Sequence, residues 1–276
     1  MYYDLNKDKY IKTKTSKSLK FLYNTLIGRI ILKIAILKPI SKLYAKYLNS
    51  KYSVKMIDKF IKKNNIDMND YIKKNYKSFN EFFIREIKKG KRKISDGLIS
   101  VCDSKLSVYD ISDDTTLKIK DSIYTIEELI GEKKKYKKAL IFRLTADDYH
   151  HYIYPDDGKV IKTKHINGKL HTVQAIAQKK YKIFHENDRE ITFLECKNLK
   201  EVCYIEVGAL LVGKIVNEKK KEFKKGEEKG HFEFGGSTII LLINSDIDIN
   251  NKIIDNSNKD IETIVKLGDK IGKWYY

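Results

Sequence analysis

Residues 231–242 read HFEFGGSTIILL. The flanks, His231–Phe234 and Ile239–Leu242, have the pattern of β-strands, and the tetrad Gly235-Gly236-Ser237-Thr238 lies between them. Because glycine has no Cβ, the backbone there can adopt a strained conformation, and a neighbouring group can approach the Gly236 carbonyl closely. The nearest electrophile to the Ser237 hydroxyl is therefore its own preceding peptide bond. For the tetrad taken alone, a hairpin turn with a capping serine is the simpler alternative.

Most of the chain after residue 98 shows a similar strand pattern, with short β-branched segments bounded by Gly, Asn or Asp. One short helix is expected at Thr125–Ile130, because Thr125 and Glu128 form a capping-box pattern and Gly131 follows as a stop signal. Strands do not alternate with long helices, which disfavours a doubly wound sheet. We expect an α+β fold with N-terminal amphipathic helices on a β-rich core of mainly antiparallel strands. The expected strands are Leu98–Val101, Leu106–Tyr109, Thr116–Ile119, Ala139–Leu144, Glu190–Leu194, Val202–Val216 and Thr238–Ile243.

The N-terminal part has a helical pattern from Lys20 to about Lys63, with a break at Pro39. Cationic residues interrupt its apolar positions, so the segment is too charged to span a bilayer. We expect an amphipathic helix pair that lies either on a membrane or on the protein's own core, and both alternatives stay open. The apolar positions are Leu22, Leu26, Ile30, Ile34 and Leu37 before the break and Leu43, Tyr47, Val54, Ile57 and Ile61 after it.

Positive charge is concentrated in the same region. The formal net charge is +19, yet only five of the 56 basic residues are arginines. Arginine makes the bidentate contacts that read phosphate and guanine, so this ratio disfavours a nucleic-acid-binding protein. Residues 1–63 alone carry +13. This excess favours an anionic membrane surface, where each basic residue contributes roughly 1 kcal/mol.

The cysteines and the other metal-ligating residues give no sign of a metal site. Cys102, Cys196 and Cys203 are odd in number and have no CxxC spacing. They indicate reduced thiols without a disulfide framework or a zinc site. No spacing of His, Asp or Glu indicates a metal either.

Five blocks of the chain, in the same order, resemble the phosphatidylserine decarboxylase family. The last block, Lys225–Thr238, resembles the family's processing segment. One block alone would be weak evidence, but five in register from about residue 79 to 243 are specific. The other four are Phe82–Ile94, Cys102–Val108, Arg143–His150 with Pro155 and Gly158 beyond it, and Glu206–Ile215.

The resemblance implies that the chain cleaves itself between Gly236 and Ser237. Ser237 then becomes a covalent pyruvoyl cofactor at the start of an α chain, residues 237–276, and residues 1–236 form the β chain. The resemblance also implies that His150 is the base for processing and for catalysis, and that Asp103 orients it. A neutral imidazole held in one tautomer by a carboxylate is the usual general base near pH 7.

The chain departs from the family pattern at several positions. Many members have a second histidine three residues after the first, where this chain has Ile153, with His151 beside His150 instead. Either the second histidine is dispensable or His151 partly replaces it. Further differences are Lys93 in place of the usual proline, Ser104 in place of glycine, and changed polar positions in His171–Ala177, which resembles a substrate-lining segment.

We expect a pyruvoyl-dependent decarboxylase that converts phosphatidylserine to phosphatidylethanolamine at the cytoplasmic side of the cell membrane, with residues 1–78 as a helical membrane-associating region and residues 79–276 as the catalytic domain. Its partners would be the anionic phospholipid substrate and its own α and β chains, with a homodimer as an open alternative and no nucleic acid. The rival functions are an unprocessed, inactive relative that binds anionic lipid, and a pyruvoyl enzyme for a soluble amino acid. Candidates to meet the substrate phosphate or carboxylate are Arg143, Lys105 and Lys159, although solvated surface charge is an equal alternative for both lysines.

Overall fold

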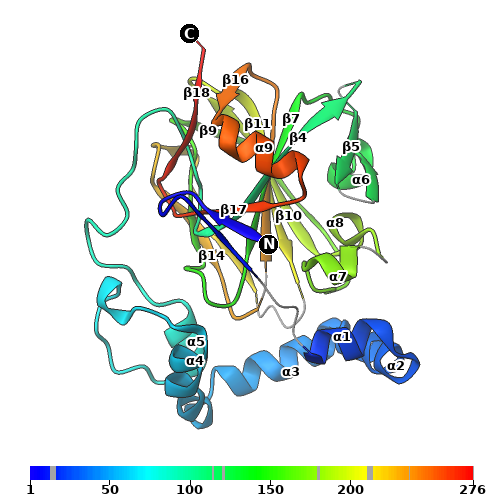
Figure 1. Cartoon of the computed structure of the whole chain (residues 1–276), viewed down its shortest axis with the longest axis vertical. Helices are drawn as coiled ribbons and strands as arrows, with labels where there is room; N and C mark the ends of the chain where they lie inside the picture. The colour runs from blue at the N-terminus through cyan, green and yellow to red at the C-terminus, as the bar shows by residue number, and fades with distance from the viewer. Residues whose placement is uncertain are drawn as a thin grey trace.

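The computed structural model describes residues 1–12, 17–113, 115–119, 122–178, 181–209, 214–235 and 237–275. Its helices gather at two places, with α1 to α5 together at one end of the molecule and the others against the sheet (Figure 1). The helices are α1 (Lys17–Asn24), α2 (Leu26–Ala35), α3 (Lys38–Leu48), α4 (Ile57–Asn64), α5 (Phe79–Phe83), α6 (Ile126–Ile130), α7 (Ala175–Gln178), α8 (Ile183–Glu186) and α9 (Asn251–Asn258), with 3-10 helices at Lys51–Met56 and Met68–Asp70.

A large sheet forms the centre of the fold. Its strand order is β13-β9-β10-β11-β15-β7-β4-β17-β1-β2, and β5 and β6 extend it from β4. All of these pairs are antiparallel except β1 with β17, so the expected α+β class is confirmed. The strands are β1 (Tyr2–Asp4), β2 (Lys9–Ile11), β4 (Ser104–Ser112), β5 (Thr116–Ile119), β6 (Ser122–Thr125), β7 (Lys138–Leu144), β9 (Gly158–Ile166), β10 (Arg189–Cys196), β11 (Lys200–Gly208), β13 (Glu222–Phe223), β15 (Ser237–Ile243) and β17 (Glu262–Val265).

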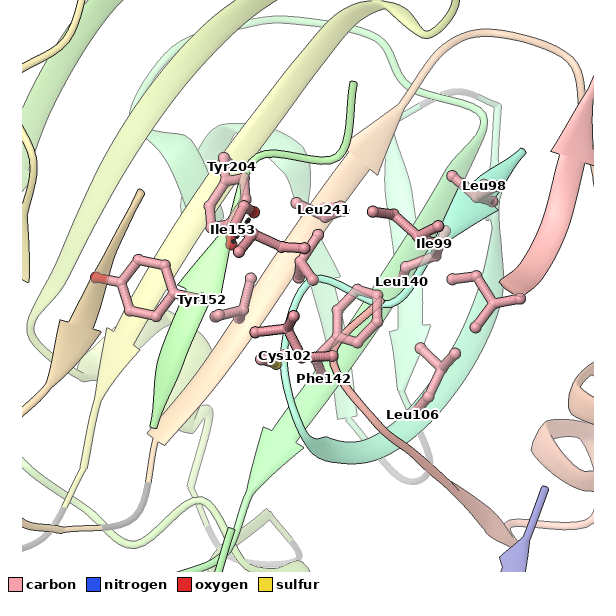
Figure 2. Packing of buried hydrophobic residues seen from close by; sticks show 14 of the residues in the cluster. Leu98, Ile99, Cys102, Leu106, Leu140, Phe142, Tyr152, Ile153, Tyr204 and Leu241 are labelled. Carbon is pink, nitrogen blue, oxygen red and sulfur yellow. Dashed lines mark hydrogen bonds between the residues drawn. The ribbon is translucent and has the colours of Figure 1, made fainter. Parts of the chain in front are cut away.

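Two small sheets cover one face of the large sheet. One has the order β12-β14-β8 and the other β16-β18-β3. Their side chains and those of α9 share a core with the large sheet; Figure 2 shows Leu140, Phe142 and Leu241 of the large sheet beside Leu98 and Ile99. The strands are β3 (Leu98–Ile99), β8 (His151–Ile153), β12 (Ile215–Asn217), β14 (Glu228–Phe232), β16 (Ile247–Ile249) and β18 (Lys270–Trp274).

The opposite face of the large sheet packs on helices. Its core includes Ile126 and Leu129 of α6, Phe184 of α8, and Tyr23 and Leu32 of α1 and α2. The predicted capping box at α6 is confirmed, since Thr125 and Glu128 exchange side-chain and backbone hydrogen bonds and Gly131 ends the helix at φ 67°. Helices α1 and α2 therefore contact this core through few buried side chains, among them Tyr23 and Leu32.

The chain up to residue 78 is not helical throughout. Strands β1 and β2 join the large sheet, where β1 pairs with β17 from the far end of the sequence. The helices begin at Lys17, and Pro39 occupies the first turn of α3, where its missing N–H costs no hydrogen bond. The predicted break at Pro39 therefore marks a helix start, and the turn itself lies just before it.

The tetrad that contains Ser237 does not form a hairpin. Strand β14 pairs with β8 and β12, whereas β15 pairs with β11 and β7 in the large sheet. The stretch between β14 and β15 thus carries the chain from one sheet to another. The hairpin alternative is wrong, because the two flanking strands are not partners.

Candidate active site

Ser237 is the first residue of β15, in the middle of the large sheet. It lies opposite Gly208 of β11 on one side and Leu144 of β7 on the other. Its side chain is fully buried, and its Oγ has no hydrogen-bond partner among the described residues. A buried hydroxyl without a partner is costly, which is typical of a group kept for chemistry.

Gly235, which follows Phe234, has a backbone conformation that is accessible mainly to glycine. Gly235 has φ 142°, in the region that residues with a Cβ rarely adopt. Gly236, the predicted cleavage position, and the end of the Glu206–Ile215 block, residues 210–213, lie outside the described residues. The unusual backbone conformation expected in the tetrad is therefore present at Gly235, while the approach to the Gly236 carbonyl stays a prediction.

His150 is fully buried beside this segment. Its Nδ1 lies 2.9 Å from the Asp148 carbonyl oxygen, which can only accept, so Nδ1 carries the hydrogen. Nε2 then presents a lone pair, and it has no partner in the part of the chain that the structure describes. Burial lowers the pKa of His150 to about 3, so the ring is neutral at physiological pH.

Aromatic packing brings His150 to the stretch that leads into Ser237. The Phe83 ring lies 4.1 Å from the His150 ring and 5.0 Å from the Phe234 ring, centroid to centroid. The Phe232 amide also donates to the His150 carbonyl oxygen at 3.0 Å. Helix α5, strand β14 and the loop after β7 thus converge on one place.

Asp103 has different partners from those that the resemblance implied. Its buried carboxylate accepts from Arg92 Nε at 3.0 Å and Nη2 at 2.7 Å, from Lys266 Nζ at 3.0 Å and from the Leu267 amide at 2.8 Å. These donors hold the pKa of Asp103 below its usual value despite burial. The Asp148 carbonyl, and not this carboxylate, orients the His150 ring. The expected direct Asp103–His150 hydrogen bond is therefore absent from these described residues, because four donors already surround Asp103.

The position of the family's second histidine is filled by hydrophobic packing. Ile153 is buried in the core of the large sheet, and its amide donates to the Val101 carbonyl at 3.0 Å. The neighbouring His151 has both ring nitrogens engaged elsewhere, at Glu228 Oε1 (2.8 Å) and at the Ile84 carbonyl (3.1 Å). Nothing in these contacts joins His151 to Ser237.

The basic residues suggested for substrate anions already have partners. Lys105 binds both oxygens of Asp148, at 2.8 and 2.6 Å, in a buried ion pair. Arg143 makes a bidentate pair with Glu262 at 2.9 and 2.6 Å. Lys159 is exposed and pairs with Glu195 at 3.2 Å. For Arg143 and Lys105 the structure supports a role in holding the fold.

The segment that resembles a substrate lining lies near Ser237. The side-chain amide of Asn187 donates to the His171 carbonyl at 2.7 Å and to the Gly208 carbonyl at 2.8 Å. Gly208 is the ladder partner of Ser237, so Asn187 joins the two regions. The Thr172 amide in turn donates to the Tyr23 hydroxyl of α1 at 3.2 Å.

A buried ion pair lies one row behind Ser237 on the same face of the sheet. Glu206 is opposite Ile239, two residues along β15, and its carboxylate binds Lys229 of β14. Both side chains are almost fully buried, and burial raises the pKa of Glu206 to about 7. Lys229 also lines a cavity of about 570 Å³ in which five lysines outnumber two glutamates, Glu190 and Glu218. The lysines are Lys214, Lys219, Lys220, Lys221 and Lys229.

A family profile described as phosphatidylserine decarboxylase matches residues 79–273. The chain belongs to the phosphatidylserine decarboxylase family. It is 50% identical to phosphatidylserine decarboxylase proenzyme 2 of Clostridium acetobutylicum over 98% of this chain and 96% of the relative. Identity to the phosphatidylserine decarboxylase proenzyme of Clostridium kluyveri is 41% over 94% and 93% of the two chains, and to that of Clostridium tetani 38% over 95% and 93%.

The residues present fit the family's cofactor, a pyruvoyl group formed from a serine of the chain itself. Among the described residues, the buried Ser237 hydroxyl has no hydrogen-bond partner, and Ser237 follows the glycine pair.

The sequence did not point to Arg85, which is buried and whose Nη2 lies 3.5 Å from the Asp148 carbonyl oxygen that also holds His150. Nor did it point to the Glu206–Lys229 pair. Both lie inside the blocks quoted above, but nothing local marks them as buried.

Proposed function

We propose that this chain is a self-cleaving precursor of a pyruvoyl-dependent phosphatidylserine decarboxylase. Cleavage between Gly236 and Ser237 separates a β chain, residues 1–236, from an α chain, residues 237–276. The assembled enzyme converts phosphatidylserine to phosphatidylethanolamine and CO₂. The observation that carries the proposal is the Ser237 hydroxyl, buried without a described partner at the head of a central strand, in a chain of this family.

In the processing step, His150 takes the proton from Ser237. Its Nε2 is free to accept because Nδ1 donates to the Asp148 carbonyl. As Ser237 Oγ bonds to the Gly236 carbonyl carbon, the peptide C–N bond breaks and its nitrogen takes up a proton, which leaves an ester. Loss of the Ser237 α-proton then expels the Gly236 carboxylate and leaves a dehydroalanine at the new N-terminus. Addition of water to this residue releases ammonia and leaves the pyruvoyl group.

We assign Asp103 a positioning role in the same site. Its carboxylate binds Lys266, and the positive charge of Lys266 helps to lower the pKa of Asp148 to about 2. Asp148 carries the carbonyl that holds His150. Asp103 therefore positions His150 indirectly, because it binds Lys266, which interacts with Asp148, whose carbonyl holds the ring.

The pyruvoyl group supplies the electron sink for decarboxylation. Ser237, which carries it, is fixed between β11 and β7 by the ladders on both sides. The Phe83 ring lies beside His150, with the Phe234 ring packed on Phe83, and together they exclude water from the site. Because the resting His150 ring is neutral, its Nε2 first accepts a proton from the substrate ammonium group and then delivers it to the substrate α-carbon after CO₂ leaves.

The N-terminal helices are the surface that we assign to the membrane. Apolar side chains of α2 are exposed, from 46% for Ile31 to 71% for Leu26, and Ile30 and Ile34 continue the stripe. Exposed stripes of this kind with flanking cations are typical of helices that lie in a lipid interface. Among the described residues, no helix is both long and apolar enough to cross a membrane. From the exposed stripe of α2 we propose that the protein binds the cell membrane peripherally, at its cytoplasmic surface.

The intact mass of freshly purified protein tests the proposal. Processing should yield an α chain of 40 residues with a blocked N-terminus, about 4.7 kDa as its share of the 276-residue, 32.3 kDa precursor. Ser237→Ala should remain one chain of full mass and should not decarboxylate phosphatidylserine, whereas Thr238→Ala, which changes the adjacent hydroxyl, should still be cleaved. A wild-type chain of full mass that binds anionic liposomes without turnover would instead identify the unprocessed relative.

A further inference from the structure

His151, Glu228 and His231 bring three metal-ligating side chains together outside the reaction site. One nitrogen of each imidazole and one carboxylate oxygen lie within 4.8 Å of one another. The two histidines are direct neighbours across the β8–β14 ladder, 80 residues apart in sequence, and a bulge in β14 brings Glu228 to the same place. It is the single group of three such donors in the described part of the chain.

The hydrogen bonds of His151 require a positive species in this cluster. Its Nε2 lies 3.1 Å from the Ile84 carbonyl oxygen, which only accepts, so Nε2 carries a hydrogen. In a neutral ring, Nδ1 then has a lone pair that faces Glu228 Oε1 at 2.8 Å. Two lone pairs at this distance repel each other unless a second proton or a bound cation lies between them.

The arrangement has the features of a metal site. A histidine that binds a metal usually donates its other N–H to a carboxylate or a backbone carbonyl, as His151 does to Ile84. With ligand distances of about 2.0–2.1 Å, the 2.8 Å separation of Nδ1 and Oε1 corresponds to an angle of roughly 90° at the metal, which fits an ion that completes its coordination with water and not a closed tetrahedral site. Glu228 and His231 keep 45% and 20% of their side chains exposed, which leaves a path for an ion and room for water ligands.

We propose that His151, Glu228 and His231 bind a divalent transition-metal ion of the class that takes imidazole and carboxylate ligands, such as Zn²⁺. The ion joins the strand after His150 to the strand that leads into the processing segment. It contributes to stability, because an ion that binds only the folded state shifts the unfolding equilibrium. No step of the reaction depends on it.

The experiment measures metal binding by tag-free protein that has been stripped with a chelator. Isothermal titration with Zn²⁺ should give one site per chain, and Co²⁺ should produce d–d absorption bands that Zn²⁺ abolishes. Zn²⁺ should also raise the melting temperature. The Ser237→Ala precursor should bind in the same way, so the result is independent of self-cleavage.

Variants assign the ligands. Glu228→Gln and His231→Gln should each weaken Zn²⁺ binding by at least about tenfold, the smallest loss typical even for an outer-shell partner. The control is His165→Gln, because His165 forms a similar pair with Asp188 at 3.1 Å but lies outside the cluster; it should bind as the wild type does. If His231→Gln does not fold, the Zn²⁺ affinity of Glu228→Gln tests the proposal, because the Glu228 side chain is nearly half exposed and its substitution should not disturb folding.

Two results would overturn the proposal. Absence of saturable Zn²⁺ binding by wild-type protein would mean that the three side chains form a hydrogen-bonded cluster and not a metal site. Equal affinity in wild type, Glu228→Gln and His231→Gln would place the ion elsewhere.

Discussion

At the residue scale, His150 and Asp103 are held by separate sets of partners, so their roles can be measured separately. His150→Ala removes the base and should abolish both cleavage and turnover. Asp103→Asn leaves Arg92 and Lys266 without their shared counter-charge and should leave mostly uncleaved precursor, because His150 is then less well positioned. The measurement is the fraction of precursor cleaved over time after expression, read from the two chain masses under denaturing conditions.

Asp70→Asn is the matched control for Asp103→Asn. Asp70 also binds Arg92, at 3.3 Å, but it is part-exposed, whereas Asp103 is fully buried. This variant should be cleaved at the wild-type rate. Normal cleavage of Asp103→Asn would remove Asp103 from the site and leave it a purely structural residue.

The buried pair of Lys105 and Asp148 gives a pH-dependent prediction. Lys105→Met should lower the free energy of unfolding by about 3–5 kcal/mol at pH 7, because it leaves a buried carboxylate unpaired. In the wild type the pKa of Asp148 is lowered to about 2, so its contribution is present above the unfolded pKa near 3.8 and is lost as pH falls toward 2. In the variant, burial favours the protonated form of Asp148. The difference in unfolding free energy between wild type and Lys105→Met should therefore become smaller near pH 4.

Urea unfolding of the uncleaved Ser237→Ala background is the measurement for this pair. The control is Lys138→Met, because Lys138 of β7 pairs with Asp110 of β4, the strand that also carries Lys105, and Asp110 is largely exposed. An exposed pair of this kind should contribute at most about 1 kcal/mol. A loss for Lys105→Met that is no larger than the control would show that the buried pair does not stabilise the site.

At the element scale, the exposed stripe of α2 predicts how the enzyme attaches to lipid. Changing Ile30 and Ile34 together to Gln keeps the charge but removes two apolar side chains, each of which contributes up to about 1.5–3 kcal/mol when fully buried. Co-sedimentation with liposomes that contain phosphatidylserine should fall at least about tenfold. High salt should release part of the wild-type protein, since the remaining attraction is electrostatic.

Ile161→Gln on β9 is the control for α2, because Ile161 is equally exposed, at 57%, but lies in the sheet. It should bind liposomes as the wild type does. Unchanged binding of the α2 variant would mean that the helices attach elsewhere or serve another subunit.

The elements that sequence reasoning predicted are those with strong local signals. The capping box of α6 and the apolar strands β7 and β15 were placed within a residue or two, because their patterns depend on neighbours in sequence. Strand β8, with three residues, and β9, which contains three lysines, were missed. Their strand conformation depends on partners far along the chain, and an exposed edge of the sheet tolerates lysine.

The same distinction holds for the active site. Ser237 could be predicted because the glycine pair and the flanking strands are local, and the family blocks added His150. The partners of Asp103 could not, because Lys266 and Leu267 are more than 160 residues away. The His151–His231 contact likewise depends on the pairing of two short strands.

At the scale of the whole molecule, the sheet should hold the α and β chains together after cleavage. All seven residues of β15 are buried, and the strand has ladders with β11 and β7 on both sides. Strand β17 of the same α chain lies between β4 and β1. We expect both chains in one peak by size exclusion in native buffer, and separation only in denaturant. Release of the α chain without denaturant would contradict this arrangement.

The position of β15 between two strands of the other chain also determines the order in which the protein folds and is cleaved. Before cleavage, the link between β14 and β15 tethers the last 40 residues to the rest, so the sheet assembles within one molecule. After cleavage, a copy that unfolds must find its missing strands by collision, which makes recovery slow and dependent on concentration. Folding must therefore precede cleavage. Processed enzyme that has unfolded is replaced by newly synthesised precursor and does not refold efficiently.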